Sequence, residues 1–260
     1  MLIALAGGLA VGLLVGMLGG GGAILSIPLL VYALGFSAHE ATASSLVIVG
    51  AGALTGIITQ HRQRNVDLKK GALFGLLGLA GSYVASKISA DIDGNLLLTL
   101  FAALLVLVAL TMLLKVRKKK SDSYQRPGHL QDKPDYRILP LLLTATGIGF
   151  LTGFFGVGGG FAVVPALTLV LGFSMQTAIG TSLVVILINS LSAIVFRIED
   201  VMSADWSIVT PFALASIGGS LVGSVLMRHI PRRVLQIIFA LFLLVIAIFM
   251  GSQNIPSLIH

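Results

Sequence analysis

The stretch GMLGGGGAILSIP, residues 16–28, interrupts an apolar N-terminal segment that would otherwise form an ordinary membrane helix. Its four consecutive glycines are unfavourable inside a helix, because each costs about 1 kcal/mol relative to alanine. The whole segment, residues 2–34, is also longer than the roughly 20 residues that one untilted span needs. We therefore expect the helix to break at these glycines, either as a re-entrant hairpin or as one broken span.

The composition is typical of an integral membrane protein. Only 10% of the 260 residues are charged, whereas a soluble domain carries about 25%. The mean hydropathy is +1.02. We predict an all-α polytopic membrane protein with about eight hydrophobic segments. These segments are residues 2–34, 41–60, 71–90, 95–115, 138–171, 178–196, 207–227 and 233–250.

The opening motif occurs twice in the chain. Residues 153–183, GFFGVGGGFAVVPALTLVLGFSMQTAIGTSL, align without a gap on residues 16–46, GMLGGGGAILSIPLLVYALGFSAHEATASSL, at a constant spacing of 137. Glycines, a proline, a Gly-Phe-Ser turn and a Ser-Leu pair coincide. Such duplication is typical of transporters with internal repeats. We divide the chain into a first transmembrane repeat, a basic linker and a second transmembrane repeat, which are residues 1–115, 116–137 and 138–260.

The positive charges indicate how the repeats lie in the membrane. Eight of the 17 Lys and Arg residues lie between Lys115 and Arg137. The positive-inside rule favours a cytoplasmic linker of a multi-pass membrane protein over a nucleic-acid site. If each glycine-rich segment turns back, 15 Lys and Arg residues lie on the linker side and 2 on the other; with single crossings the count is 13 against 4. We therefore expect inverted repeats.

The glycine motifs are candidate anion sites. A helix that begins just after the glycines directs free N–H groups and a partial positive charge of about +0.5 toward the break. Unwound backbone at membrane depth is tolerated only inside the protein or beside a watery cavity. Tight helix packing through small residues is the alternative explanation. The predicted substrate-binding glycines are Gly19, Gly20, Gly21, Gly22, Gly156, Gly158, Gly159 and Gly160.

Polar side chains in the following segments could complete such a site near the midplane. The candidates are Ser44, Ser45, Thr181, Ser182 and Asn189. Hydroxyl and amide groups donate to anion oxygens, although hydroxyls also cap helices and bond backbone carbonyls. The chain has no intramembrane carboxylate pair, no zinc motif, no nucleophile elbow and no cysteine. We therefore predict no enzyme activity, no catalytic residue, no metal and no cofactor.

The paired GMLGGGGAILSIP and GFFGVGGGFAVVP motifs, each followed by a Gly-Phe-Ser turn and a Thr/Ser-rich helix start, resemble the TauE/SafE sulfite-exporter family. The resemblance covers essentially the whole chain, including the basic loop between the halves. It implies an inner-membrane permease for sulfur-containing anions such as sulfite, thiosulfate or organosulfonates. One departure is that Gly20 of the first motif corresponds to Val157 of the second, so the two breaks are not equivalent.

These observations lead to three hypotheses of function. The first is a secondary transporter that moves a small oxyanion by alternating access around the two breaks. The second is an anion channel, and the third is a non-transport membrane scaffold subunit. The expected partners are a small anionic substrate and the lipid bilayer, with no nucleic acid. A homodimer is compatible with the sequence, which does not define a coupling ion.

Overall fold

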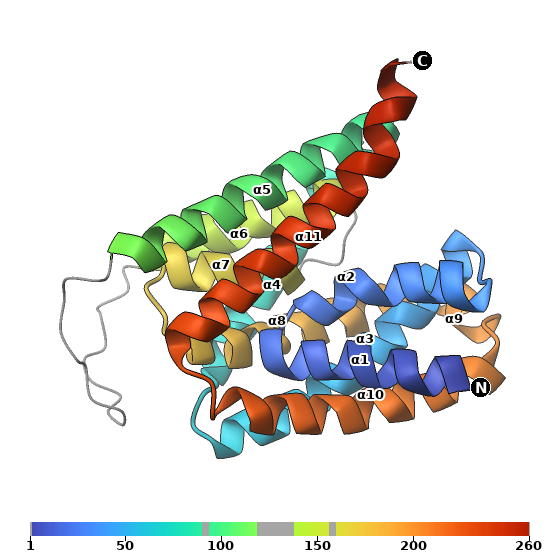
Figure 1. Ribbon diagram of the computed structural model, residues 1–260, viewed down its shortest axis with the longest axis horizontal. Helices are drawn as coiled ribbons and strands as arrows, with labels where there is room; N and C mark the ends of the chain where they lie inside the picture. The colour runs from blue at the N-terminus through green and yellow to red at the C-terminus, as the bar shows by residue number, and fades with distance from the viewer. Residues whose placement is uncertain (1, 90–93, 119–137, 156–159, 260) are drawn as a thin grey trace.

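The computed structural model describes residues 2–89, 94–118, 138–155 and 160–259 (Figure 1). Within these ranges every regular element is helical. The first half contains α1 (Leu2–Leu18), α2 (Gly21–Pro28), the π-helix η1 (Leu29–Ala33), α3 (Ala38–Arg62), α4 (Leu68–Ser89) and α5 (Gly94–Lys118). The second half contains α6 (Ile138–Phe155), α7 (Gly160–Leu169), α8 (Met175–Phe196), α9 (Ile198–Met202), α10 (Trp206–Met227) and α11 (Arg232–Ile259).

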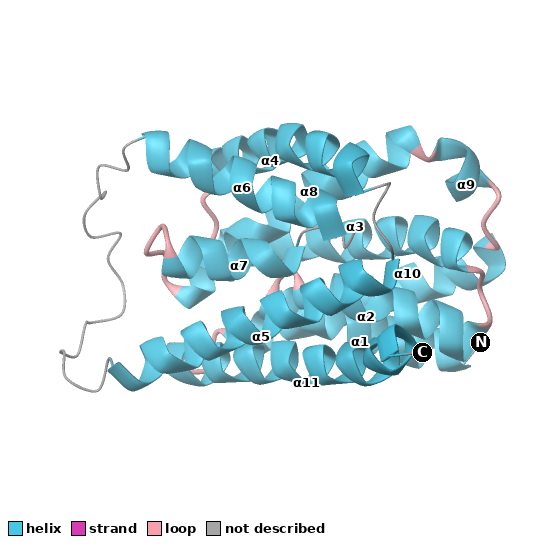
Figure 2. Cartoon of the chain, turned by 90° about the horizontal axis from the view of Figure 1, so that it is seen from above, coloured by secondary structure: helices cyan, strands magenta, loops and turns pink. Residues whose placement is uncertain are grey.

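Several of these helices have the length and composition of membrane spans. In the described ranges, four helices are long and apolar enough to cross a bilayer: Glu40–Arg62, Met175–Phe196, Trp206–Met227 and Arg232–Phe249. Shorter apolar stretches are Leu2–Leu18, Leu100–Leu114 and Leu142–Leu151. Figure 2 shows the long helices side by side in one view, and Figure 1 shows that α5 and α11 run obliquely to α1 and α10. The prediction of a helical membrane protein is therefore confirmed.

The first hydrophobic segment is a hairpin. Helix α1 ends at Leu18, Gly19 takes a left-handed φ of +72°, and α2 begins two residues later. A Cβ atom built on Gly22 would overlap Val15, and one built on Gly7 would lie 3.8 Å from Leu29 Cδ1. Gly22 lies beside Val15, near the end of α1, and Leu29, just after α2, lies near Gly7. Helix α2 is therefore antiparallel to α1.

The repeated Gly-Phe-Ser turns start the next long helix of each half. The residue pairs are Gly35 and Gly172, Phe36 and Phe173, and Ser37 and Ser174. Each glycine adopts a left-handed φ, +75° and +69° respectively, which a residue with a side chain adopts only with strain. Each phenylalanine N–H donates back to the preceding helix, at 3.1 and 2.9 Å. Each serine then caps the following helix by accepting a backbone N–H.

Glycine and serine allow the helices to pack closely across the two halves. Helix α1 packs against α10, and α4 packs against α6. A Cβ atom on Gly12 would overlap the backbone of Ser216, and one on Gly16 would overlap that of Ser220. Because the partners advance together by four residues, α1 and α10 run in the same direction. Close backbone approach through small residues is the common way for helices to associate in membranes.

The two ends of the helix bundle carry opposite charges. We call the end where α3 and α10 finish and α4, α8 and α11 begin the basic end; Gln60 Nε2 of α3 lies 3.4 Å from Met227 Sδ of α10 there. Among the residues with assigned exposure, its charged residues are Arg62, Arg64, Lys69, Lys70, Arg228, Arg232 and Arg233, together with Asp67. At the opposite, acidic end α9 packs against the start of α3, where the charged residues are Glu40, Arg197, Glu199, Asp200 and Asp205.

Replacing a contact glycine of α1 tests this packing. Gly12→Val forces two methyl groups into the backbone of α10, so we expect a loss of about 1–3 kcal/mol in the free energy of unfolding. Gly147→Val is the matched control, because a Cβ atom on Gly147 of α6 meets nothing within 4 Å. Unfolding of the purified variants in detergent measures both effects. Equal stability of the two variants would contradict the packing described.

Candidate functional site

The first glycine break lies inside the protein, against the second half of the chain. A Cβ atom on Gly19 would overlap Ser182 Oγ of α8 and lie 3.2 Å from Val164 Cγ2 of α7. Leu18, immediately before it, is fully buried. The break therefore faces the helices that follow the second glycine motif, and no lipid reaches its exposed backbone groups.

The depth of the break follows from its neighbour on α8. Ser182 lies seven residues after Met175, the first residue of α8, which corresponds to about 10 Å along the helix axis. Helix α8 has 22 residues. The break therefore lies about one third of the way along α8 from the basic end.

The start of α2 provides backbone donors at this position. The first N–H groups of an α-helix have no acceptor within the helix. Gly20, the N-cap residue of α2, provides no side-chain cap. The partial positive charge of the helix start is therefore not offset by a capping side chain. The anion hypothesis therefore assigns the donors to the backbone N–H groups of Gly20, Gly21 and Gly22.

The four predicted hydroxyl residues have different environments. Ser182 lies against the break and its Oγ donates to Ile179 O at 2.7 Å. Ser45 Oγ donates to Thr42 O at 2.7 Å. Thr181 Oγ1 accepts the Asp67 N–H at 3.1 Å. Ser44, 1% exposed, has no hydrogen-bond partner for its Oγ.

Asn189 lies on the same face of α8 as Ser182. The two are seven residues apart, close to two helical turns, so their side chains leave the helix in nearly the same direction. Asn189 Oδ1 is buried and has no hydrogen-bond partner. Val185 and Ile186, both buried, separate these two polar side chains on the face of α8 that runs from the break toward the acidic end. A buried amide without a partner costs free energy unless a water or a ligand satisfies it.

The second glycine motif is described only in part. Gly156, Gly158 and Gly159 lie outside the described residues, and Gly160 begins α7. Helix α7 contacts α2. The helices that follow the two glycine motifs therefore lie against each other, although the meeting of the two breaks themselves stays a prediction.

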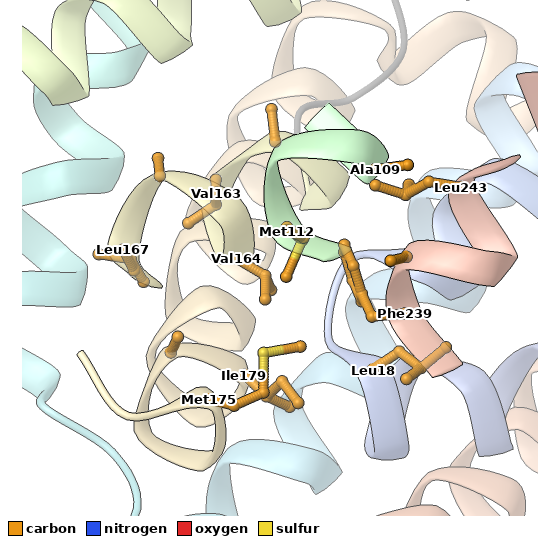
Figure 3. Close-up of a cluster of buried hydrophobic side chains, with 14 of the residues drawn as sticks. Leu18, Ala109, Met112, Val163, Val164, Leu167, Met175, Ile179, Phe239 and Leu243 are labelled. Atoms are coloured by element: carbon orange, nitrogen blue, oxygen red, sulfur yellow. The ribbon is translucent and has the colours of Figure 1, made fainter. Parts of the chain in front are cut away.

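Apolar side chains lie on both sides of the break. A second buried cluster, which includes Leu183 and Ile186 of α8, lies toward the acidic end. On the basic side, Figure 3 shows residues of α1, α5, α7, α8 and α11 in one buried cluster. Among them Leu18, Leu167 and Ile179 are fully buried. A solute at the break would have to displace this cluster to reach the basic end.

A row of buried serines on α10 was not predicted from the sequence. Ser216, Ser220 and Ser224 are each fully buried. Their Oγ atoms donate to Ile48 O at 3.4 Å, Gly52 O at 2.7 Å and Gly16 O at 3.4 Å. Their regular spacing of four residues in an apolar segment was the available signal. Among the described residues, no three His, Cys, Asp or Glu side chains gather into a metal site.

The apolar helices, four of them long enough to cross a bilayer in the described ranges, define a helical membrane protein. Residues 4–250 match the family described as Sulfite exporter TauE/SafE. The chain therefore belongs to the TauE/SafE family of membrane transporters, as its motifs suggested. No solved structure matches it significantly.

Three curated relatives cover nearly the same length. A "Probable membrane transporter protein" of Xylella fastidiosa strain 9a5c is 31% identical over all of this chain and 98% of its own. The "Probable membrane transporter protein YunE" of Bacillus subtilis is 24% identical over 95% of this chain and 94% of its own. The "Probable membrane transporter protein YdhB" of Bacillus subtilis is 27% identical over 86% and 89% respectively.

Alanine at Gly19 tests the contact between the break and α8. Gly19→Ala and Gly35→Ala place a methyl group on nearly the same backbone conformation, with φ of +72° and +75°. Gly35→Ala meets nothing within 4 Å and should lose only the strain of a left-handed backbone, about 1–2 kcal/mol. Gly19→Ala should lose more stability because its methyl group overlaps Ser182 Oγ.

Unfolding of the detergent-purified variants measures this difference. Adding Ser182→Gly to Gly19→Ala should recover part of the additional loss, because it removes the overlapping atom. Equal losses for the two alanine variants would contradict the contact.

Proposed function

We propose that the chain is a secondary transporter for small sulfur-containing oxyanions, such as sulfite, thiosulfate or organosulfonates. The substrate binds at the start of α2, beside Ser182, on the face of α8 that leads to Asn189. The observation that carries this proposal is the burial of the Gly19 break against α8. The substrate class rests on the description of the family, which names sulfite.

The donors at this site suit a transported anion. Backbone N–H groups, a hydroxyl and an amide are neutral donors. In the described residues, the Lys and Arg side chains with assigned exposure lie toward the helix ends. Charge-assisted hydrogen bonds are roughly twice as strong as neutral ones. A site of neutral donors therefore releases its anion more readily than one built around a buried arginine.

We further propose that the two halves form inverted repeats. Helices α3 and α8 correspond at the 137-residue spacing. Gly50 of α3 lies against Ser190 of α8, and Gly56 lies against Leu183. Since the positions rise on one helix and fall on the other, α3 and α8 are antiparallel. The packing of α1 on α10 and of α6 on α4 supports the same arrangement.

Alternating access fits these contacts better than an open channel. The apolar cluster of Figure 3 lies on the basic side of the break, and a second apolar cluster with Leu183 and Ile186 lies on the acidic side. A conducting pore would need a continuous polar path, whereas a carrier closes one side at a time. The two packed halves, each with its own glycine motif, could rock around the α3–α8 crossing.

Oxyanion counterflow tests the transport proposal. Purified protein in liposomes preloaded with unlabelled sulfite should take up labelled sulfite faster than in empty liposomes, because a carrier exchanges substrate across the bilayer. Thiosulfate, sulfate and a small sulfonate serve as competitors. Equal uptake with and without preloading would indicate a channel. No uptake of any of these anions above protein-free liposomes would refute the proposed substrate class.

Asn189 provides the matched variant for this assay. Asn189→Leu keeps the approximate volume but removes both polar atoms, so we expect about a tenfold loss of exchange. Thr111→Val is the control, because Thr111 is exposed and its hydroxyl donates to Val108 O within α5. Wild-type exchange in Asn189→Leu would remove Asn189 from the site.

We also propose that the basic end faces the cytoplasm of a bacterial inner membrane, on the same side as the linker 116–137. Single cysteines test this sidedness, because the natural chain contains none. In intact cells an impermeant maleimide should label Ser203→Cys at the acidic end and leave Arg228→Cys at the basic end unlabelled. Inside-out vesicles should reverse the pattern. Labelling of both positions from one side would contradict the assignment.

A further inference from the structure

The connection between α3 and α4 lies directly on the start of α8. The Asp67 N–H donates to Thr181 Oγ1 at 3.1 Å, which joins the two halves of the chain. A Cβ atom on Gly180 would overlap Asn65 O. The connection therefore approaches α8 so closely that only glycine fits at position 180.

Lys70 extends this junction to the turn before α8. Its Nζ lies 3.1 Å from Asp67 Oδ2 and 5.1 Å from the centre of the Phe173 ring. Phe173 belongs to the Gly-Phe-Ser turn of the second half. One residue of α4 thus contacts both the connection of its own half and the turn of the other. We call Asp67, Lys70, Phe173 and Thr181 the latch.

The matching positions at the acidic end lack the corresponding hydrogen bond. At the spacing of 137, Thr181 corresponds to Ser44 and Asp67 corresponds to Ala204. The Ala204 N–H donates to Val201 O, at 3.3 Å. Ser44 Oγ is buried and without a partner. Burying an unpaired hydroxyl costs free energy, so a conformation that pairs it gains stability.

We propose that the latch holds the basic end closed in this conformation, and that Ser44 accepts the Ala204 N–H when the latch opens. The inference rests on the proposed alternating access. It makes Thr181 a positioning residue that keeps the basic end closed, in place of the substrate ligand predicted from the sequence. In this conformation Thr181 accepts the Asp67 N–H and Ser44 is unpaired. In the other conformation Ser44 accepts the Ala204 N–H and Thr181 is unpaired.

A reporter cysteine tests the latch without a substrate. Val184 of α8 is 7% exposed, and its Cβ lies 2.9 Å from a Cβ built on Gly71 of α4. Opening the basic end would separate α4 from α8 and expose this position. Val184→Cys is the only thiol in that protein, so its reaction with an impermeant maleimide, added to purified protein in detergent, reports the opening directly.

Thr181→Val keeps the shape of the side chain and removes the acceptor, so labelling of Val184→Cys should accelerate roughly fivefold. Lys70→Gln should accelerate it as well, and it provides a second test if Thr181→Val does not fold. Thr59→Val is the matched control, because the Thr59 hydroxyl bonds Thr55 O within α3. It should leave the labelling rate unchanged. Ser44→Ala should slow labelling, because it removes the bond of the other conformation.

An unchanged labelling rate in both Thr181→Val and Lys70→Gln would overturn the latch, and faster labelling in Ser44→Ala would overturn the role of Ser44. Thermal unfolding of each variant separates opening from general destabilisation, which would also accelerate labelling in Thr59→Val. Sulfite exchange is measured in parallel. If the wild type moves no oxyanion while labelling responds as expected, the proposed function fails and the latch stands.

Discussion

The structure depends on the need to satisfy every backbone N–H and C=O group in hydrocarbon. A helix meets this need within itself, whereas a break at four glycines exposes several groups at a cost of several kcal/mol each. The chain meets it by folding α2 back along α1 and enclosing the turn between α7 and α8. The enclosure explains why residues from both halves surround the first glycine motif. In the proposed function, it is also where an anion meets backbone donors away from lipid.

The same small residues that allow close packing also satisfy the backbone near the break. Because α1 ends at Leu18, the Gly16 carbonyl lies in the last turn of the helix, where an intrahelical donor is missing. Ser224 Oγ of α10 lies 3.4 Å from this carbonyl, and only a glycine at position 16 lets α10 come so close. Glycine at position 16 is therefore required both for the packing of α1 on α10 and for the hydrogen bond that stabilises the end of α1. A larger residue at the contact would disturb both.

The sequence predicted the local features and missed those that depend on distant pairs. Glycine runs, segment lengths and the Gly-Phe-Ser turns follow from backbone preferences, and the break after Leu18 lies where they predict. The contact of Gly19 with Ser182 joins residues more than 160 positions apart, so no periodicity could indicate it. Thr181 shows the same limit, because a hydroxyl beside a candidate ligand looks like another ligand until its bond to Asp67 is known. Ser216 and its neighbours on α10 could have been found from their spacing, but not the carbonyls that they bind.

The two halves differ at positions that, in the proposed mechanism, set the relative energies of the two closed conformations. They share the turn that begins α3 and α8, yet only the second half pairs the hydroxyl that follows. A duplicated chain with fully equivalent halves would have no preferred conformation, because the two closed states would be equal in energy. In the proposed mechanism, sequence differences between the halves remove that equality. Examples are Thr181, which corresponds to Ser44, and Val157, which corresponds to Gly20. The difference in free energy between the two closed states must remain small, because a ligand shifts their equilibrium only by its difference in affinity for them. One neutral hydrogen bond is of a size that the binding of a small anion can offset.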